Sequence, residues 1–150
     1  MGKVITGATM SLDGYIAGPN ESGFDQLFQW YGDGEVEVPS ASPRVPTIRT
    51  SAASAELLKS ELGDTGALVV GRHLYNLTNA WGGQHPMNVT VVVLTQRRPD
   101  DRPEDDENFV FVTGGVEAAV ARAKQLAGGQ ERRRQRRADG AAVPGGRSAR

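Results

Sequence analysis

The sequence predicts an α/β fold in which short buried strands alternate with helices. Three runs rich in Val, Leu and Phe, residues 67–70, 89–94 and 109–112, are largely uninterrupted by polar residues. Such runs are typical of strands that are buried on both faces of a largely parallel sheet. Two other segments, residues 54–62 and 115–127, carry apolar residues at helical spacing. A chain of 150 residues is long enough for one domain with a buried core.

The first element predicted along the chain is a strand over residues 3–10, where apolar residues alternate with others. It runs directly into the loop of residues 11–19, which contains an Asp-Gly and a Gly-Pro pair. Two sharp reversals after a strand are typical of the mouth of a sheet, where open α/β proteins bind ligands. An ordinary surface turn explains the same residues, because Asp-Gly is a very common turn signal.

The later elements are helices and short strands. A helix over residues 54–62 precedes the strand of residues 67–70, and a short helix over residues 72–78 follows that strand. The strand of residues 89–94 comes next, and the strand of residues 109–112 leads into the helix of residues 115–127. Proline and serine content predicts a loop over residues 39–46, and acidic content predicts a solvated connection over residues 99–107.

The end of the strand of residues 67–70 carries Gly71 and Arg72, where the short helix is expected to begin. Free N–H groups at the start of a helix favour a phosphate group, so this end suits the pyrophosphate of a dinucleotide. The structural alternative is a glycine that closes a strand and an arginine on a solvated helix face. The residues by themselves leave both interpretations open.

The second strand end, after Leu94, carries a hydroxyl group and two guanidinium groups in the run Thr95, Gln96, Arg97 and Arg98. Guanidinium groups bind phosphate with two hydrogen bonds, and an arginine near the ribose selects a 2′-phosphate. This loop therefore favours NADP over NAD. The alternative is a pair of surface arginines that balance the acidic run of residues 100–107.

The third strand end repeats the pattern with Thr113, Gly114 and Gly115. Thr113 suits a helix N-cap, and the two glycines would let a ligand approach the backbone closely. Three such endings on three buried strands are harder to explain by chance than one. Together they indicate a nucleotide site.

Composition excludes several classes of site. The chain has no cysteine and two histidines, so we expect neither a disulfide nor a metal centre. It has neither an apolar run long enough to span a membrane nor a leading basic and apolar signal, so we expect a cytoplasmic protein.

Charge divides the chain in two. Residues 1–129 hold 10 Lys and Arg against 16 Asp and Glu, whereas residues 130–150 hold 7 Arg against 2 acidic residues. The second segment contains no Leu, Ile, Met or aromatic residue. It has almost nothing to bury, and we expect it to be a disordered, arginine-rich tail.

Four motifs, in residues 11–19, 68–72, 81–86 and 91–99, resemble one known family. It is the group of dihydrofolate-reductase-like proteins related to the C-terminal reductase domain of the bacterial riboflavin-biosynthesis deaminase-reductase. The resemblance covers residues 1–129. It implies a three-layer α/β/α fold with a mainly parallel mixed sheet, an NADPH cofactor and hydride transfer to a ribosylaminopyrimidine or related heterocycle. It also suggests a homodimer.

The resemblance implies roles for individual residues. Those expected to bind the cofactor are Ala8, Gly71, Arg72, Thr95, Gln96, Arg97, Arg98, Thr113, Gly114 and Gly115. Those expected to line the substrate are Ser11, Leu12, Asp13 and Gly14. Asp13 is the carboxyl group nearest the expected site and is the candidate proton donor. Asp25 is a second candidate, by distant analogy with true dihydrofolate reductases.

The chain departs from the family after Gly129. Family members continue with a further strand, a Gly-Gly turn, another helix and the last strands of the sheet, whereas this chain has an arginine-rich segment. We interpret the reductase-like region as incomplete at its C-terminus, with a shift of reading frame near Gln130 that the gene sequence can test. Two alternatives to a working reductase follow: an inactive truncated fragment, and a nucleotide-binding module without turnover.

A basic arm for nucleic acid is the rival interpretation of residues 130–150. Five arginines within six positions, 132–137, could neutralise several phosphates. The segment lacks the aromatic residues that stack on bases, so we do not expect nucleic acid as a partner.

Overall fold

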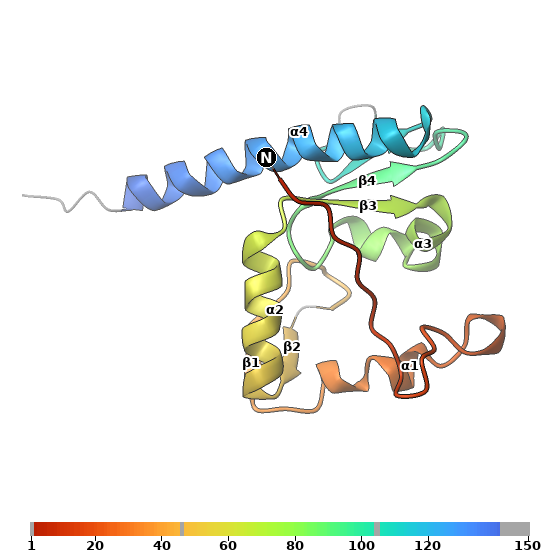
Figure 1. The fold of residues 1–150 in the computed structure, drawn as a ribbon, viewed down its shortest axis with the longest axis vertical. Helices are drawn as coiled ribbons and strands as arrows, with labels where there is room; N and C mark the ends of the chain where they lie inside the picture. Colours follow the sequence, from red (N-terminus) through yellow and green to blue (C-terminus); the bar gives the residue numbers. More distant parts are fainter. Residues whose placement is uncertain (1, 46, 104–105, 142–150) are drawn as a thin grey trace, which may run out of the picture. The chain divides into compact units, whose positions relative to one another are not determined.

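The computed structural model describes residues 2–45, 47–103 and 106–141, and the side chains among them up to Gly129. It contains helices, an antiparallel hairpin and one three-stranded parallel sheet (Figure 1), so the predicted α/β class is confirmed. The chain divides into two compact units. The first combines residues 1–65 with 75–88, and the second combines residues 66–74 with 89–150.

The second unit is built on a three-stranded parallel sheet. Its strands are β3 (Ala67–Gly71), β4 (Thr90–Leu94) and β5 (Phe109–Val112), in the order β3-β4-β5. All three lie where the unbroken apolar runs predicted them. Val91, Val92 and Val93 in the central strand have no exposed surface, as expected for a strand covered on both faces.

Helix α4 (Gly115–Ala141) covers one face of this sheet. Val92 of β4 packs with Ala119 and Ala123 of the helix to form the core of the unit, with other partly buried residues of the sheet around them. The two alanines lie four residues apart, on one face of the helix. Their small side chains let the helix backbone approach the sheet.

Helix α4 is longer than the helix predicted over residues 115–127. Its backbone stays helical through residues 130–141, the first part of the segment for which we expected disorder. Arg, Gln, Glu and Ala have high helix propensity, which accounts for helical backbone where there is little to bury. Residues 142–150 of the expected tail lie outside the described residues. In the part of the chain that the structure describes, every helix is too short or too polar to span a lipid bilayer.

The first unit contains a short antiparallel hairpin that the sequence analysis did not predict. Its strands are β1 (Val36–Pro39) and β2 (Thr47–Thr50), paired so that Val38 lies opposite Ile48. Helix α2 (Ala52–Asp64) packs against the hairpin, and Val38, Ile48 and Ala55 form the core. The helix begins at Ala52, two residues before the predicted start. The N-cap is Ser51, whose hydroxyl accepts a hydrogen bond from the Ser54 N–H at 3.3 Å.

The remaining helices of the chain are short. They are η1 (Pro19–Glu21), α1 (Phe24–Leu27), η2 (Gln29–Tyr31), α3 (Arg72–Leu77) and η3 (Asn79–Gly83). Helix α3 lies where the sequence predicted it. Segment η3 is unusual, because Asn79, Ala80 and Trp81 have φ values of 49°, 50° and 50°, in the left-handed region that residues with a Cβ adopt rarely.

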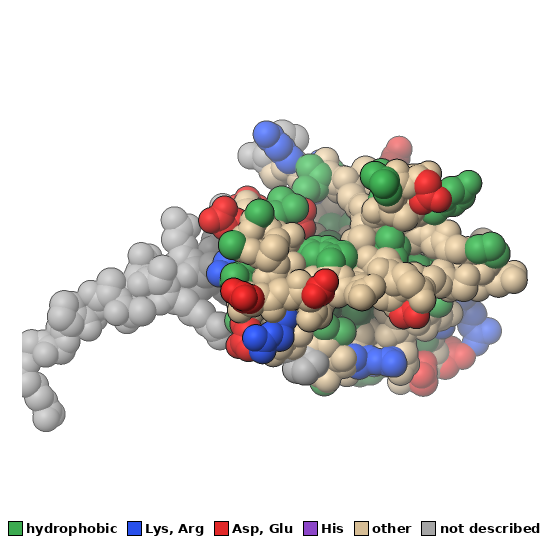
Figure 2. All heavy atoms as spheres, turned by 90° about the horizontal axis from the view of Figure 1, so that it is seen from below, with side chains coloured by type: hydrophobic (Ala, Val, Ile, Leu, Met, Phe, Trp, Pro, Cys, Tyr) green, Lys and Arg blue, Asp and Glu red, His purple; other side chains and the backbone are tan. Residues whose placement is uncertain are grey.

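The strand predicted over residues 3–10 is wrong. These residues form no strand, and Figure 1 draws them as an extended tube. The side chains of Val4, Ile5 and Met10 are 63%, 83% and 62% exposed. Alternation of apolar and other residues predicts a strand only where a neighbouring strand pairs with the segment. Among the described residues, no strand pairs with residues 3–10. Apolar side chains therefore reach the surface, as the green groups in Figure 2 show for one face of the molecule.

Candidate functional site

The three strand ends singled out in the sequence lie along one edge of the sheet in the second unit. Strands β3, β4 and β5 are parallel, with Gly71 opposite Leu94 and Leu94 opposite Val112. The residues that follow each strand therefore leave the sheet at the same edge. Parallel α/β sheets bind ligands at this carboxyl edge.

Hydrogen bonds tie the strand ends together. The Thr95 N–H donates to the Val112 carbonyl at 3.0 Å, and the Arg72 guanidinium donates to the Arg97 carbonyl at 3.3 Å. The Thr95 hydroxyl also donates to the Arg97 carbonyl at 2.8 Å. These bonds connect the ends of all three strands, so the loop after β4 is held against its neighbours.

A cleft of about 480 Å³ opens at this edge. It is lined by Arg72, Arg97, Arg98, Pro99, Asp100 and Asp101. Three guanidinium groups face two carboxylates, so the lining favours an anion by one charge. The residues that the sequence indicated for a phosphate, Arg72, Arg97 and Arg98, are thus brought to one cleft.

The ion pair between Arg97 and Asp100 in the cleft is weak. The Arg97 guanidinium lies 2.5 Å from the Asp100 carboxylate, and both side chains are about 80% exposed. Exposed pairs contribute roughly 0–1 kcal/mol, so a phosphate can compete for this arginine. Arg98 donates to the carbonyl oxygens of Arg102 and Pro103 in the following loop.

Seven of the ten residues expected to bind the cofactor do not line the cleft; they are Ala8, Gly71, Thr95, Gln96, Thr113, Gly114 and Gly115. Gln96 is exposed beside it, and the run from Thr113 to Gly115 lies at the third strand end, at the start of α4. Gly115 has a φ of 88°, a conformation that favours glycine. This third end is open to solvent, and its backbone is accessible to a ligand.

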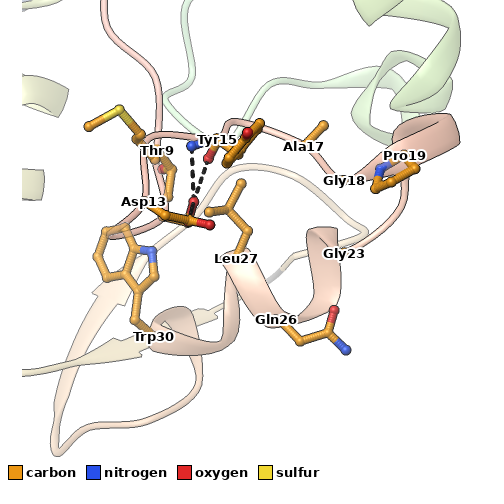
Figure 3. Close-up of a pocket in the computed structure, with 12 residues that line it drawn as sticks. Thr9, Asp13, Tyr15, Ala17, Gly18, Pro19, Gly23, Gln26, Leu27 and Trp30 are labelled. Atoms are coloured by element: carbon orange, nitrogen blue, oxygen red, sulfur yellow. Dashed lines mark hydrogen bonds between the residues drawn. The ribbon is translucent and has the colours of Figure 1, made fainter.

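The loop after residue 10 belongs to the first unit and is organised by Ser11. The Ser11 hydroxyl lies 2.7 Å from the Asp13 carboxylate and 3.0 Å from the Tyr15 carbonyl, and it accepts the Tyr15 N–H at 3.0 Å (Figure 3). The Gly14 N–H donates to the Ser11 carbonyl at 3.0 Å, and Gly14 has a φ of 93°. The Asp-Gly turn is therefore tight, and its serine fixes the direction of the aspartate.

A pocket of about 920 Å³ lies beside this loop (Figure 3). It is lined by Thr9, Met10, Ser11, Asp13, Tyr15, Ala17, Gly18, Pro19, Gly23, Gln26, Leu27 and Trp30. Ser11 and Asp13 are the two expected substrate residues that reach it. Ala8, Leu12 and Gly14 do not line it. Its wall combines apolar and aromatic side chains with few polar groups, which is typical of a small-molecule site.

Sequence reasoning missed Trp30 as a lining residue. The aromatic residues between Phe24 and Tyr31 form a connected group, in which the rings of Trp30 and Tyr31 are 4.2 Å apart. Burial, followed by the negative charge of Glu61, raises the pKa of Tyr31, and a hydrogen bond with Thr9 acts in the opposite direction. The close spacing of the aromatic residues between Phe24 and Tyr31 is the sequence signal by which this wall could have been found.

Asp25 does not line the pocket. Its carboxylate accepts a hydrogen bond from the Gln26 side chain at 2.7 Å, on the exposed surface of α1. Asp13 is therefore the better placed of the two candidate proton donors. Asp13 and the cleft of Arg97 belong to different units of the chain.

The donor groups of the described residues suit an organic anion better than a cation. No group of three or more His, Asp or Glu side chains among them is arranged to hold a metal ion. No protein-family model matches this sequence, and no curated protein matches it. What the site can do follows from its own chemistry: an arginine-lined cleft at the carboxyl edge of a parallel sheet, and an aromatic pocket that contains one carboxylate.

Proposed function

We propose that this protein binds NADPH at the carboxyl edge of β3, β4 and β5 and acts as an NADPH-dependent reductase. The observation that carries the proposal is the meeting of Arg72, Arg97 and Arg98 in one cleft. Arginine forks match phosphate oxygens, and a 2′-phosphate is what distinguishes NADPH from NADH. The sequence motifs that resemble the riboflavin-biosynthesis and dihydrofolate reductases supply the reaction class.

The chain's own residues would have three tasks. Arg97 and Arg98 would bind the 2′-phosphate, and Arg72 with the open backbone from Thr113 to Gly115 would bind the pyrophosphate. The bound cofactor supplies the hydride. The aromatic pocket would hold a planar heterocycle such as a ribosylaminopyrimidine, and Asp13, oriented by Ser11, would hold a proton for it.

A nucleotide-binding module without turnover, or an inactive fragment of a reductase, is the second candidate. It is favoured by the segment of residues 2–10, which is exposed and belongs to no strand. A reductase requires the substrate and the cofactor to meet in a fixed geometry. Residues 2–10 lie next to the proposed substrate pocket but pair with no strand among the described residues, so they do not hold the substrate in a fixed position.

Calorimetric titration of the full chain with NADPH and with NADH tests the cofactor site. We expect NADPH to bind more tightly, because each charge-assisted bond to the 2′-phosphate contributes about 1.5–3 kcal/mol. Removing both guanidinium groups in the variant Arg97→Ala, Arg98→Ala should weaken NADPH binding by at least about 10-fold and leave NADH binding nearly unchanged. Arg49→Ala, at an exposed arginine of β2 paired with Glu37, is the matched control. Equal affinity for the two nucleotides in the unmodified chain would refute the assignment.

Turnover separates the reductase from the binding module. Oxidation of NADPH, followed by absorbance, should depend on added ribosylaminopyrimidine or folate analogue if the chain is a reductase. Tight binding of NADPH without such oxidation would support the module instead. Absence of both would support the inactive fragment.

A further inference from the structure

We propose that the pocket beside Ser11 and Asp13 binds an organic cation: an amine that carries one positive charge and neither a phosphate nor a carboxylate. The inference deepens the proposed function, on which it rests as far as it describes a substrate. As a statement about binding it concerns the first unit alone and is tested without a cofactor. It is carried by the side chains of the pocket wall and by the charge of the chain that forms it.

The pocket wall contains one charged side chain. Of the residues that line the cavity of about 920 Å³, Asp13 alone carries a charge, and none is Lys, Arg or His. An anion in this pocket would face the Asp13 carboxylate with no cation in the wall to offset it, which is unfavourable. A cation would gain the same carboxylate as a partner. The wall therefore favours a positively charged ligand over a negatively charged one.

The Asp13 carboxylate has one oxygen available to a ligand. The Ser11 hydroxyl lies 2.7 Å from Oδ1. In the described part of the chain, no group donates a hydrogen bond to the second oxygen, Oδ2, and no Lys or Arg pairs with Asp13. A hydrogen bond between an ammonium group and a carboxylate is stronger than one between neutral groups. Because Ser11 fixes the direction of the side chain, Oδ2 is oriented before a ligand arrives.

Aromatic rings supply a second attraction for a cation. Trp30 and Tyr15 line the same pocket as Asp13 (Figure 3). The face of an aromatic ring is negatively polarised and attracts ammonium groups, and tryptophan attracts them most strongly. Met10 and Leu27 add apolar surface for the hydrocarbon part of the ligand. A carboxylate combined with aromatic rings suits an amine that carries an apolar or aromatic group.

The chain that forms the pocket is strongly acidic. Residues 4–43 contain six Asp and Glu and no Lys, Arg or His. Charge of one sign raises the local concentration of ions of the opposite sign and speeds their association. The cleft of the second unit has the reverse character, because three guanidinium groups face two carboxylates there. The two sites therefore favour ligands of opposite charge, a phosphate in the cleft and a cation in the pocket.

A positively charged ligand is compatible with Asp13 as the proton donor of the proposed reductase. An amine that takes a proton from Asp13 and an amine that arrives already protonated form the same ion pair with the carboxylate. The pocket favours the charge of the bound ligand in both cases. A substrate that places a phosphate or a carboxylate in the pocket is disfavoured in both cases as well.

Three ligands of nearly equal size test the preference: benzylammonium, which is positively charged, benzyl alcohol, which is neutral, and phenylacetate, which is negatively charged. Each is titrated into the full, isotope-labelled chain at neutral pH and low salt. The backbone amide signals of Gly18 and Gly23 in the pocket wall report binding by nuclear magnetic resonance. We expect benzylammonium to bind at least about 10-fold more tightly than benzyl alcohol, because it adds a charge-assisted hydrogen bond. Phenylacetate should bind most weakly, and added salt should weaken benzylammonium most.

Two variants assign the preference to individual residues. Asp13→Asn keeps the size of the side chain and removes its charge, so it should weaken benzylammonium by at least about 10-fold and leave benzyl alcohol nearly unchanged. Trp30→Leu removes the ring and should weaken benzylammonium by about 3-fold. Glu35→Gln is the matched control, because it removes one negative charge from the same acidic stretch outside the pocket wall. Its affinity for benzylammonium should stay nearly unchanged, and the spectra show whether each variant is folded.

Three outcomes contradict the cation site. One is that none of the three ligands binds, and the second is that phenylacetate or benzyl alcohol binds as tightly as benzylammonium. The third is an equal loss in Asp13→Asn and Glu35→Gln, which would assign the preference to the overall charge of the chain. The comparison of ligands uses the unmodified chain, so it does not depend on the folding of any variant. Failure of the proposed reductase would appear as absent binding or oxidation of NADPH, which these titrations do not measure.

Discussion

The Ser42 hydroxyl donates a 2.6 Å hydrogen bond to the backbone carbonyl of Trp81, which lies 39 residues further along the chain. Ser42 is 1% exposed, and its oxygen also accepts the Arg44 N–H at 3.2 Å. Trp81 has a φ of 50° and stands in the left-handed run of η3. One serine therefore anchors a backbone conformation that residues with a Cβ seldom adopt.

Ser42→Ala should destabilise the first unit by about 1–3 kcal/mol, because the variant removes both bonds of a buried hydroxyl. Chemical denaturation followed by tryptophan fluorescence measures the loss. Ser60→Ala is the matched control, since the Ser60 hydroxyl is exposed and makes a single 3.4 Å bond to Asp64. Similar unfolding midpoints for the two variants would show that the anchor is unimportant.

Gly34→Ala should destabilise the chain by at least about 1–3 kcal/mol, the usual cost of overpacking. A Cβ at Gly34 would lie 2.1 Å from the carbonyl carbon of Thr50, and backbone cannot move aside as a side chain can. Thermal unfolding checks the loss. Gly63→Ala is the control: it lies in α2, where a Cβ meets nothing within 4 Å, and should stabilise the helix by about 0.5–1 kcal/mol.

His85 should make stability fall as the pH falls from about 6.5 to about 4. Burial lowers the pKa of His85 from 6.5 to about 4. Its Nδ1 accepts the Met87 N–H at 3.2 Å, and its ring lies 4.6 Å from that of Trp81. In the pH range between the two pKa values the unfolded chain binds a proton that the folded chain excludes, so the loss reaches roughly 3 kcal/mol at pH 4 and is absent above pH 6.5.

The measurement for His85 is a difference between two chains, because carboxyl groups titrate in the same range. The free energy of unfolding is followed against pH for the unmodified chain and for His85→Gln. The difference between the two curves should be constant above pH 6.5 and should change steadily below it. A constant difference over the whole range would mean that the imidazole titrates alike in the folded and unfolded chain.

Asp13→Asn should lower the turnover of the proposed reductase by roughly 100-fold or more, the usual contribution of a general acid, with NADPH affinity unchanged. Ser11→Ala should produce a smaller loss, because Ser11 orients the Asp13 carboxylate without donating a proton itself. Asp25→Asn is the control, since Asp25 lies outside the pocket. Equal losses for Asp13→Asn and Asp25→Asn would remove Asp13 as the proton donor.

The sheet of the second unit was predictable because each of its strands is recognisable from consecutive residues of the sequence. The runs that became β3, β4 and β5 are continuous and β-branched, and each ends at a glycine or a threonine. Helices α3 and η3 connect β3 to the parallel strand β4, whereas β4 and β5 follow one another with no helix between them among the described residues. Because all three strands are parallel, Arg72 and Arg97 meet at one edge. The cleft at the carboxyl edge could therefore be foreseen from residues that are far apart in the chain.

The first unit was harder to predict because its structure depends on distant partners. Val38 and Ile48 pair across a loop, in strands too short to show a clear alternation. Residues 3–10 were wrongly predicted as a strand. Their apolar residues alternate clearly, but among the described residues no other strand pairs with them. The left-handed run at Trp81 has no local signal except Gly82 and Gly83, and it depends on a serine in another part of the chain.

The division of the chain into interleaved units constrains how the protein can be made. The first unit needs residues 75–88 to complete it, and these emerge from the ribosome only after β3. No single cut of the polypeptide can release either unit whole, so limited proteolysis should not yield an intact fragment of one of them. During synthesis, the loop between β1 and β2 must wait for this later stretch, because Ala41 and Ser42 hydrogen-bond to the carbonyl groups of Pro86 and Trp81.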